Sequence, residues 1–401
     1  MLDAGGARSA YQVGALDVLL PAMAARGPRP TLLIGTSAGA LLTGALTATA
    51  HLEPEEQATQ LLDVLQGATK KNVMQPLWRQ APMVLARYAS ETVGASGFRL
   101  RGLMGTAPLA QTLQRSIDWD RLHRNVEDGL VEVSAVTATS VRTGWVTMFA
   151  EATSSYGDLP DPPREHHRRY AATRLGVEHL MASSAIPVLF PSVKVSEPDF
   201  AAGWYVDGAT RRRVPLAPAL ELGADRVVLV GTGSLHPTDP DPERDQQAVD
   251  LGDGGATLLG AVMDDPLRHD LRRLAAVNGF ASNEEVAPHL NRHRAEIGRP
   301  PFRVTPYVAV APQTGAELAE LALEVFRANH GTLRRSILDP DLQLMHRLLG
   351  SDSPLQGELL SYLLFDPDFF TEAAGLGRRD AGRWMEDNPD LWRTDGLSAL
   401  S

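Results

Sequence analysis

Ser37 has the residue type and the setting of a catalytic nucleophile. It is the centre of a Gly-x-Ser-x-Gly pentapeptide, residues 35–39, which follows the apolar run 31–34 and precedes the helix-forming stretch 38–50. Small residues on both sides allow a sharp turn from strand to helix, so the hydroxyl stands at a helix N-terminus, where the helix dipole favours developing negative charge. The pattern predicts a nucleophile elbow. The alternative at this point is a plain glycine-rich turn, because the chain has 35 glycines and such a pentapeptide also arises by chance.

Asp207 is the candidate base for this serine. It ends the short strand expected from Trp204 to Val206, and the end of a strand is where sheet enzymes present catalytic groups. A carboxylate is normally a poor base toward a serine hydroxyl. We therefore expect a partly desolvated cleft in which Asp207 makes a direct hydrogen bond to Ser37 and draws its proton during attack.

A third segment could bind the negative charge that develops on an ester oxygen. The run from Ala4 to Ser9 places Gly5 and Gly6 in a turn at the start of a helix that extends to about Leu20. Glycine allows the backbone to approach a ligand closely, so the N–H groups of this turn could point at an oxyanion.

In their order along the chain, these segments resemble the patatin-like phospholipases, a family of lipid acyl hydrolases that use a serine and an aspartate without a catalytic histidine. The resemblance extends over about residues 1–235 and includes the block 182–187, the pair Phe190-Pro191 and the segment 214–216. It implies an α/β protein with a patatin-like three-layer fold, in which a central mixed or parallel sheet lies between helices. It also implies a phospholipid or another lipid ester as the substrate, and neither a cofactor nor a metal ion.

Residue roles follow from the resemblance position by position. Ser37 becomes the nucleophile, Asp207 its base, and the glycine turn the oxyanion hole. The turn residues are Gly5, Gly6, Ala7 and Arg8, and the supporting motif residues are Gly35, Gly39, Gly208, Ala209 and Pro187. The implied reaction is phospholipase A-type hydrolysis of carboxylic ester bonds through an acyl-enzyme.

The glycine turn departs from the family pattern at two positions. Where the family usually has glycine, this chain has Ala4 and Ser9. If either position requires a positive φ angle, its Cβ strains the turn and weakens the oxyanion site. A catalytically impaired scaffold or regulatory binder is therefore the alternative from another functional class. Few residues precede the turn, which leaves little of the family's first strand.

Rival catalytic groups occur elsewhere in the chain. The tripeptide Asp253-Gly254-Gly255 also matches the family's aspartate motif, but it follows the polar run 239–250 rather than a strand. An esterase of the α/β-hydrolase type would need a histidine after the aspartate, and His236 is the best candidate. His166 and His167 would point to opposite faces of a strand, so we expect a solvated loop there and no ligand pair.

Strands and helices alternate along the chain, which favours a parallel or mixed sheet covered on both faces. Further strands are expected at 131–139, 145–150, 226–231 and 303–311. We expect a catalytic α/β domain over residues 1–312, with its motif-bearing core in 1–235 and a helical insertion at about 51–105. Residues 313–401 are expected to form a helical C-terminal extension packed on the core, because the run 359–365 is apolar nearly all round.

Composition excludes several classes of function. The formal net charge of -11 argues against a general nucleic-acid binder. Without cysteine the chain has neither disulfides nor a thiolate metal site. No apolar run reaches the ~20 residues of a membrane span, and the first residues do not form a signal peptide, so we expect a cytoplasmic protein with transient peripheral contact at the inner membrane surface. The scarcity of lysine among 38 basic residues suggests a bacterial source, and the oligomeric state stays unknown.

Overall fold

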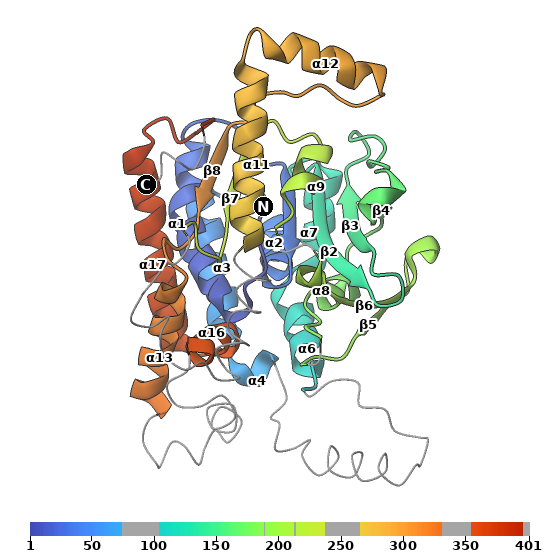
Figure 1. Ribbon diagram of the computed structural model, residues 1–401. Coiled ribbons are helices and arrows are strands. Elements are labelled where there is room, and N and C mark those ends of the chain that lie inside the picture. Colours follow the sequence, from blue (N-terminus) through green and yellow to red (C-terminus); the bar gives the residue numbers. More distant parts are fainter. Residues whose placement is uncertain (74–103, 188, 212–213, 237–264, 331–353, 396–401) are drawn as a thin grey trace, which may run out of the picture.

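The structure is a computed structural model of the 401-residue chain, and it describes residues 1–73, 104–187, 189–211, 214–236, 265–330 and 354–395. A six-stranded mixed sheet and a two-stranded parallel sheet lie among flanking helices (Figure 1). The α/β fold expected from the sequence, with a mixed sheet between helices and a helical C-terminal region, is confirmed.

Eight strands are described, and their bounds follow. They are β1 (Leu32–Thr36), β2 (Val133–Ser140), β3 (Val146–Ala152), β4 (Arg168–Ala172), β5 (Val193–Val195), β6 (Gly203–Asp207), β7 (Val227–Val230) and β8 (Tyr307–Val310). Strands β7 and β8 form the small sheet, and the other six form the large one.

The described helices fall into an N-terminal, a middle and a C-terminal group. The first group is η1 (Gly6–Arg8), α1 (Ser9–Ala24), α2 (Ala38–Ala48), α3 (Pro54–Gly67) and α4 (Lys70–Val73). The middle group is α6 (Ala107–Ser116), α7 (Trp119–Glu127), η2 (Arg164–His166), α8 (Val177–Ser183), η3 (Asp199–Ala201), η4 (Gly208–Thr210) and α9 (Leu216–Glu221). The last group is α11 (Asp265–Ser282), α12 (Val286–Glu296), α13 (Ala316–His330), α16 (Pro354–Leu363) and α17 (Pro367–Asp387).

The pairing along β2 explains how residues far apart in the sequence meet. Strand β3 runs antiparallel along one edge of β2, while β1 and β6 follow one another along the other edge. Strand β1 is parallel to β2 and brings Thr36 opposite Thr137, whereas β6 is antiparallel and brings Asp207 opposite Ala138. The carboxyl ends of β1 and β6 therefore meet beside the middle of β2.

The first residues connect the two sheets. The Leu2 amide donates to the Ile34 carbonyl at 2.9 Å, and the Leu2 carbonyl accepts from the Thr36 amide at 3.1 Å. On its other side Leu2 forms a parallel bridge to Val230. The chain then enters η1 and α1, so this short extended segment carries the glycine turn to the carboxyl end of β1.

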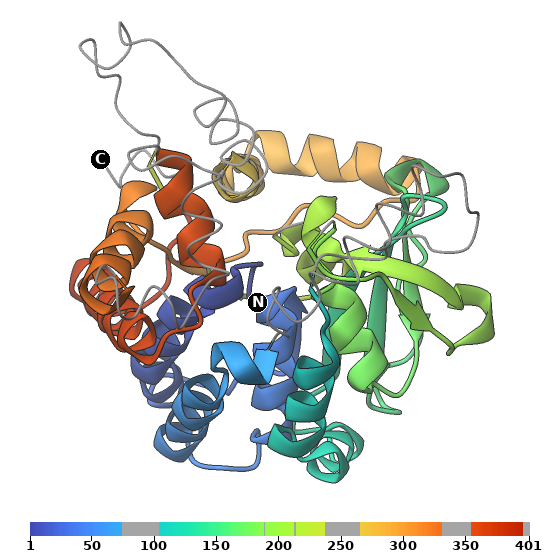
Figure 2. The same ribbon diagram turned by 90° about the horizontal axis from the view of Figure 1, so that it is seen from below.

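The C-terminal helices pack on the N-terminal part of the chain. Helix α17 lies along α1, and α16 contacts both α13 and η1. Seen from below, these red and orange helices gather beside the blue N-terminal helices, on the side away from the green strands of the large sheet (Figure 2). Leu360, Phe369 and Phe370 are buried and belong to the same hydrophobic cluster as residues of α1.

Candidate active site

Ser37 occupies the single residue between β1 and α2. Its backbone has φ 56° and ψ -125°, a strained conformation for a residue with a side chain and the one found at the serine of a nucleophile elbow. Glycines make the tight turn feasible. A Cβ on Gly35 would lie 2.2 Å from the Gly39 carbonyl oxygen, and one on Gly39 would lie 2.5 Å from the Asp3 carbonyl oxygen. These glycines therefore have steric roles in holding β1, α2 and the first residues together.

The Ser37 hydroxyl donates a hydrogen bond to the carboxylate of Asp207, with 2.5 Å between Oγ and Oδ2. Both residues are nearly inaccessible to solvent, at 4% and 3% exposure, so this contact is desolvated. The distance lies at the short end of the range for a hydroxyl and a charged acceptor. The arrangement allows direct proton transfer between the two groups.

The second oxygen of Asp207 is held by the backbone that follows it. Its Oδ1 accepts from the Ala209 amide at 2.8 Å, and its own amide donates to the Ala185 carbonyl at 2.9 Å. A Cβ on Gly208 would lie 2.4 Å from the Thr137 carbonyl oxygen, so glycine is needed for η4 to pack against β2. These contacts leave Oδ2 directed at Ser37.

Ser183, the last residue of α8, and Ser184, its C-cap, contact Ser37, although the sequence did not single them out as site residues. The Ser37 amide donates to Ser183 Oγ at 2.9 Å, and Ser183 donates in turn to the Thr137 carbonyl at 2.7 Å. Ser184 donates to the Ser37 carbonyl at 3.3 Å. Both belong to the block 182–187, which was part of the resemblance, and Pro187 lies exposed in the turn that ends this block.

The glycine turn forms η1, and its positive φ angle falls on Gly6, at 54°. Ser9 is an ordinary helical residue with φ -59°, and Ala4 is not among the residues with positive φ. The two departures from the family pattern therefore cause no strain of the kind expected. Among the described residues, no backbone acceptor pairs with the amides of Gly5, Gly6 and Ala7.

Arg8 is engaged away from Ser37. Its amide donates to the Gly5 carbonyl at 3.0 Å and closes the turn. Its guanidinium, 1% exposed, donates to Ser361 Oγ at 2.7 Å and to Glu358 Oε2 at 2.5 Å, both on α16. The structure thus places the Arg8 backbone in the turn and its charge against the C-terminal helix.

A cavity of about 100 Å³ opens at Ser37 and Gly6. Its walls are mainly apolar side chains from α2, α6, the segment after α8 and the C-terminal helices. The lining side chains include Leu42, Leu113, Ile117, Phe190, Leu363 and Phe370. No histidine is among the described residues that line it. An apolar cavity beside a serine hydroxyl is suited to hold a hydrocarbon chain.

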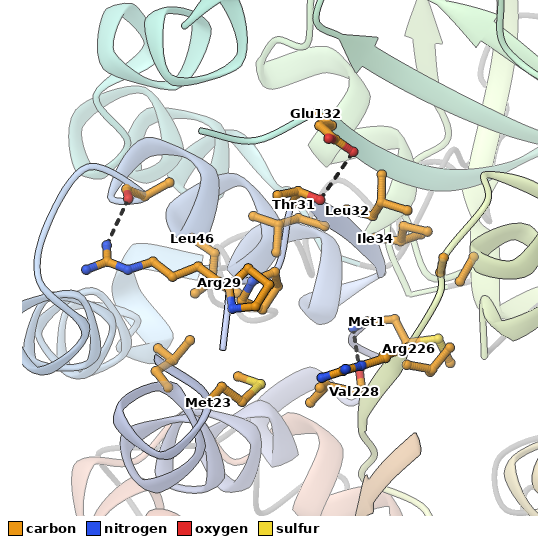
Figure 3. A pocket seen from close by; sticks show the side chains of 18 of the residues that line it. Met1, Met23, Arg29, Thr31, Leu32, Ile34, Leu46, Glu132, Arg226 and Val228 are labelled. Carbon is orange, nitrogen blue, oxygen red and sulfur yellow. Dashed lines mark hydrogen bonds between the residues drawn. The ribbon is translucent and has the colours of Figure 1, made fainter. Parts of the chain in front are cut away.

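A much larger cavity, of about 740 Å³, lies beside Met1 and the first half of β1, and Figure 3 shows its walls. Met23, Ile34, Leu46 and Val228 line it, but neither Ser37 nor Asp207 does. The Arg29 side chain in its wall donates to the Leu52 carbonyl at 2.5 Å. Size alone therefore does not identify the candidate site, since Ser37 lines the smaller of these two cavities and not the larger.

Among the described rival groups, neither His236 nor His166 lines the cavity at Ser37. The His236 amide donates to the Gln313 carbonyl at 3.3 Å, and its carbonyl accepts from Arg268 at 3.2 Å. His166 precedes β4 and contacts the Arg168 guanidinium at 3.2 Å. Within the described ranges, no group of three or more His, Asp or Glu side chains could hold a metal ion. The tripeptide 253–255 lies outside the described residues.

Two comparisons with known proteins returned matches. A family model described as Patatin-like phospholipase matches residues 1–220. Among solved structures, VipD from Legionella pneumophila is similar at 12% sequence identity with a TM-score of 0.35; the match covers 96% of this chain and 66% of that one. The chain thus spans slightly less than two thirds of VipD. No curated protein matches. In the part of the chain that the structure describes, no helix is long and apolar enough to cross a membrane.

Proposed function

Because the chain belongs to the patatin-like phospholipase family, we propose that it hydrolyses carboxylic ester bonds of phospholipids or related lipids with Ser37 as nucleophile and Asp207 as base. The family supports lipid acyl hydrolysis in general. The contact that supports the specific residues is the 2.5 Å hydrogen bond between the two side chains at the carboxyl ends of β1 and β6.

Acylation begins when Ser37 Oγ attacks the carbonyl carbon of the ester and Asp207 Oδ2 accepts its proton. The carbonyl oxygen of the tetrahedral intermediate becomes negative, and in this proposal the backbone amides of Gly5, Gly6 and Ala7 stabilise it. As the intermediate collapses, the bond to the leaving alkoxide breaks and Asp207 returns the proton to it. The products of this step are the free alcohol and an acyl group on Ser37.

Deacylation repeats the sequence with water. Asp207 takes a proton from a water molecule as the water oxygen attacks the acyl carbon. The proton then passes from Asp207 to Ser37 Oγ as the fatty acid leaves. The apolar cavity at Ser37 would hold the acyl chain during both steps, which favours lipid esters over polar ones. Transfer to another alcohol would use the same groups, and product analysis separates it from hydrolysis.

The proposal is tested by ester hydrolysis in the wild type, Ser37→Ala, Asp207→Asn and His236→Ala. We expect the first two variants to lose at least about 10³-fold in kcat, by analogy with removal of a nucleophile or its partner. His236→Ala should remain within about twofold, since its contacts lie elsewhere. Retained activity in Asp207→Asn together with loss in His236→Ala would reverse the assignment.

Covalent labelling addresses the non-enzymatic alternative. A fluorophosphonate probe should label wild-type protein at Ser37 and should not label Ser37→Ala. The scaffold hypothesis depended on a strained turn at Ala4 and Ser9, and the φ angles there give it no support. Folded wild-type protein that neither reacts with the probe nor cleaves any ester would favour that alternative.

A further inference from the structure

Helix α16 touches the glycine turn although it lies well beyond the residues that match the family model. The two backbones come close at Gly6, where an added Cβ would lie 2.4 Å from the Tyr362 carbonyl oxygen. Tyr362 also lines the cavity at Ser37 together with its neighbour Leu363. In Figure 1, α16 lies beside α13 at the lower end of the molecule, near α4. This helix therefore borders the proposed oxyanion site directly.

Arg8 is the link between the two elements. Its Nε donates to Ser361 Oγ at 2.7 Å, one terminal nitrogen donates to Tyr362 Oη at 3.2 Å, and the other to Glu358 Oε2 at 2.5 Å. The guanidinium carbon also lies 4.1 Å from the centre of the Tyr362 ring. A buried guanidinium needs a charge partner and satisfied donors, and α16 provides both.

The same residue shapes the turn through its backbone. The Arg8 amide donates to the Gly5 carbonyl and so closes η1 around Gly6 and Ala7. A displaced Arg8 side chain would carry this amide with it and would alter the direction of the amides on either side. Oxyanion donors act only when they are fixed within a narrow geometry, so a small displacement reduces the rate.

We propose that Glu358 is a positioning residue for the oxyanion turn, acting through the Arg8 guanidinium from the C-terminal helix. The inference rests on the proposed function, because it assigns a catalytic consequence to the geometry of the turn. It adds to the active site a residue 350 positions away from the turn in sequence. Ser361 assists, since its hydroxyl accepts from Arg8 and donates to the Glu358 carbonyl at 2.6 Å.

The test compares steady-state kinetics of Glu358→Gln, Glu358→Ala and Ser361→Ala with those of the wild type on one lipid ester. Glu358→Gln keeps an acceptor but loses the charge, and Glu358→Ala loses both. We expect kcat to fall by roughly 10- to 100-fold in Glu358→Ala and by less in the other two, with KM within about twofold in all three. A loss confined to kcat indicates a defect in the transition state rather than in substrate binding.

Asp17→Asn is the matched control. It breaks another ion pair between a C-terminal helix and α1, in which Asp17 Oδ2 lies 2.6 Å from Arg378 Nε, without touching the turn. A merely structural role of the C-terminal helices would make this variant lose kcat as much as Glu358→Ala does. That result, or a folded Glu358→Ala variant with unchanged kcat, would overturn the inference. If Glu358→Ala does not fold, an unchanged kcat in Glu358→Gln would overturn it instead.

The activity of the wild-type protein distinguishes failure of the proposed function from failure of the role of Glu358. If it neither hydrolyses lipid esters nor reacts with the fluorophosphonate probe, the proposed function fails and the role of Glu358 fails with it. If the wild type is active and the Glu358 variants match it, the role of Glu358 fails alone.

Discussion

The Ser183 hydroxyl accepts a hydrogen bond from the Ser37 amide, with 2.9 Å between the amide nitrogen and Oγ. The bond fixes the strained backbone of the elbow from the side of α8, because Ser183 is itself anchored to the Thr137 carbonyl. A residue with positive φ persists only when its surroundings hold it there. The elbow conformation therefore depends on α8 as well as on the glycines that flank the serine.

Ser183→Ala should weaken both activity and stability. It leaves the buried Ser37 amide and Thr137 carbonyl without this partner, which costs about 1–3 kcal/mol. If Ser37 is the nucleophile, as we propose, the looser backbone should also lower kcat roughly 10-fold. Ester hydrolysis and urea unfolding measure the two effects. Ser184→Ala removes the longer 3.3 Å hydrogen bond to the Ser37 carbonyl and should reduce activity and stability less. A larger loss in Ser184→Ala than in Ser183→Ala would contradict this account.

Gly39→Ala should destabilise the fold by more than about 3 kcal/mol. Its Cβ would meet the Leu2 and Asp3 carbonyl oxygens at 2.6 and 2.5 Å, and neither backbone can move without disturbing β1. Gly279→Ala is the matched control, because it lies inside α11 with no atom within 4 Å of the added Cβ. That change should stabilise the protein by about 0.5–1 kcal/mol in chemical denaturation. Equal changes in the free energy of unfolding for the two variants would contradict close packing at Gly39.

Much of the sheet could be predicted from the sequence because its strands carry strong local patterns. The runs that became β1, β2, β3, β7 and β8 are rich in apolar or β-branched residues, and β6 contains Trp204, Tyr205 and Val206. The elbow was predictable for a similar reason, since steric demands restrict a sharp strand-to-helix turn to small residues. The contact between Ser37 and Asp207 follows from these strands once their pairing is known.

Strands β4 and β5 could not be predicted in the same way. Strand β4 begins with Arg168 and Arg169, and charge of this kind normally indicates a loop. In the fold Arg168 pairs with Glu221 from α9, and Arg169 donates to Tyr205 Oη at 2.8 Å. Strand β5 has only three residues, Val193–Val195, too few to show alternation. Contacts with residues distant in the sequence therefore determine that both segments form strands.

The contact of α16 with Arg8 could not be predicted from the sequence either. The run 359–365 was expected to pack on the core because of its apolar character, but nothing in it indicates that Arg8 would be the partner. The ion pair to Glu358 joins residues with a separation of 350. Such a contact depends on the packing of whole helices, which local patterns do not determine.

Acid should destabilise the protein through His179 on α8. Its Nδ1 accepts from the Gly176 amide at 3.0 Å and its Nε2 lies 3.2 Å from the Glu197 carbonyl, which suits a neutral ring. Burial lowers the pKa of His179 from its usual 6.5 because it disfavours the charged ring. His179 therefore binds a proton more readily in the unfolded chain than in the folded one. Its contribution to the free energy of unfolding is complete above about pH 6.5 and declines as the pH falls through that value toward the lower pKa of the folded state.

Urea unfolding between about pH 8 and pH 5 checks this prediction. His179→Gln should be less stable than the wild type at pH 8 but should lose less on acidification. The exposed His293 provides the control, since His293→Gln should follow the wild-type pH dependence. An unchanged pH dependence in His179→Gln would assign the acid sensitivity to other groups.

Leu113→Phe should shift the substrate preference toward shorter acyl chains. Leu113 lines the apolar cavity at Ser37, and a ring in its place would occupy space that the hydrocarbon chain needs. Each methylene displaced from an apolar site loses about 0.8 kcal/mol, or roughly fourfold in kcat/KM. A series of esters that differ only in chain length measures the shift. Leu20→Phe introduces the same change in the larger cavity beside Met1 and should leave the preference unaltered; a shift there instead would place the acyl chain in that cavity.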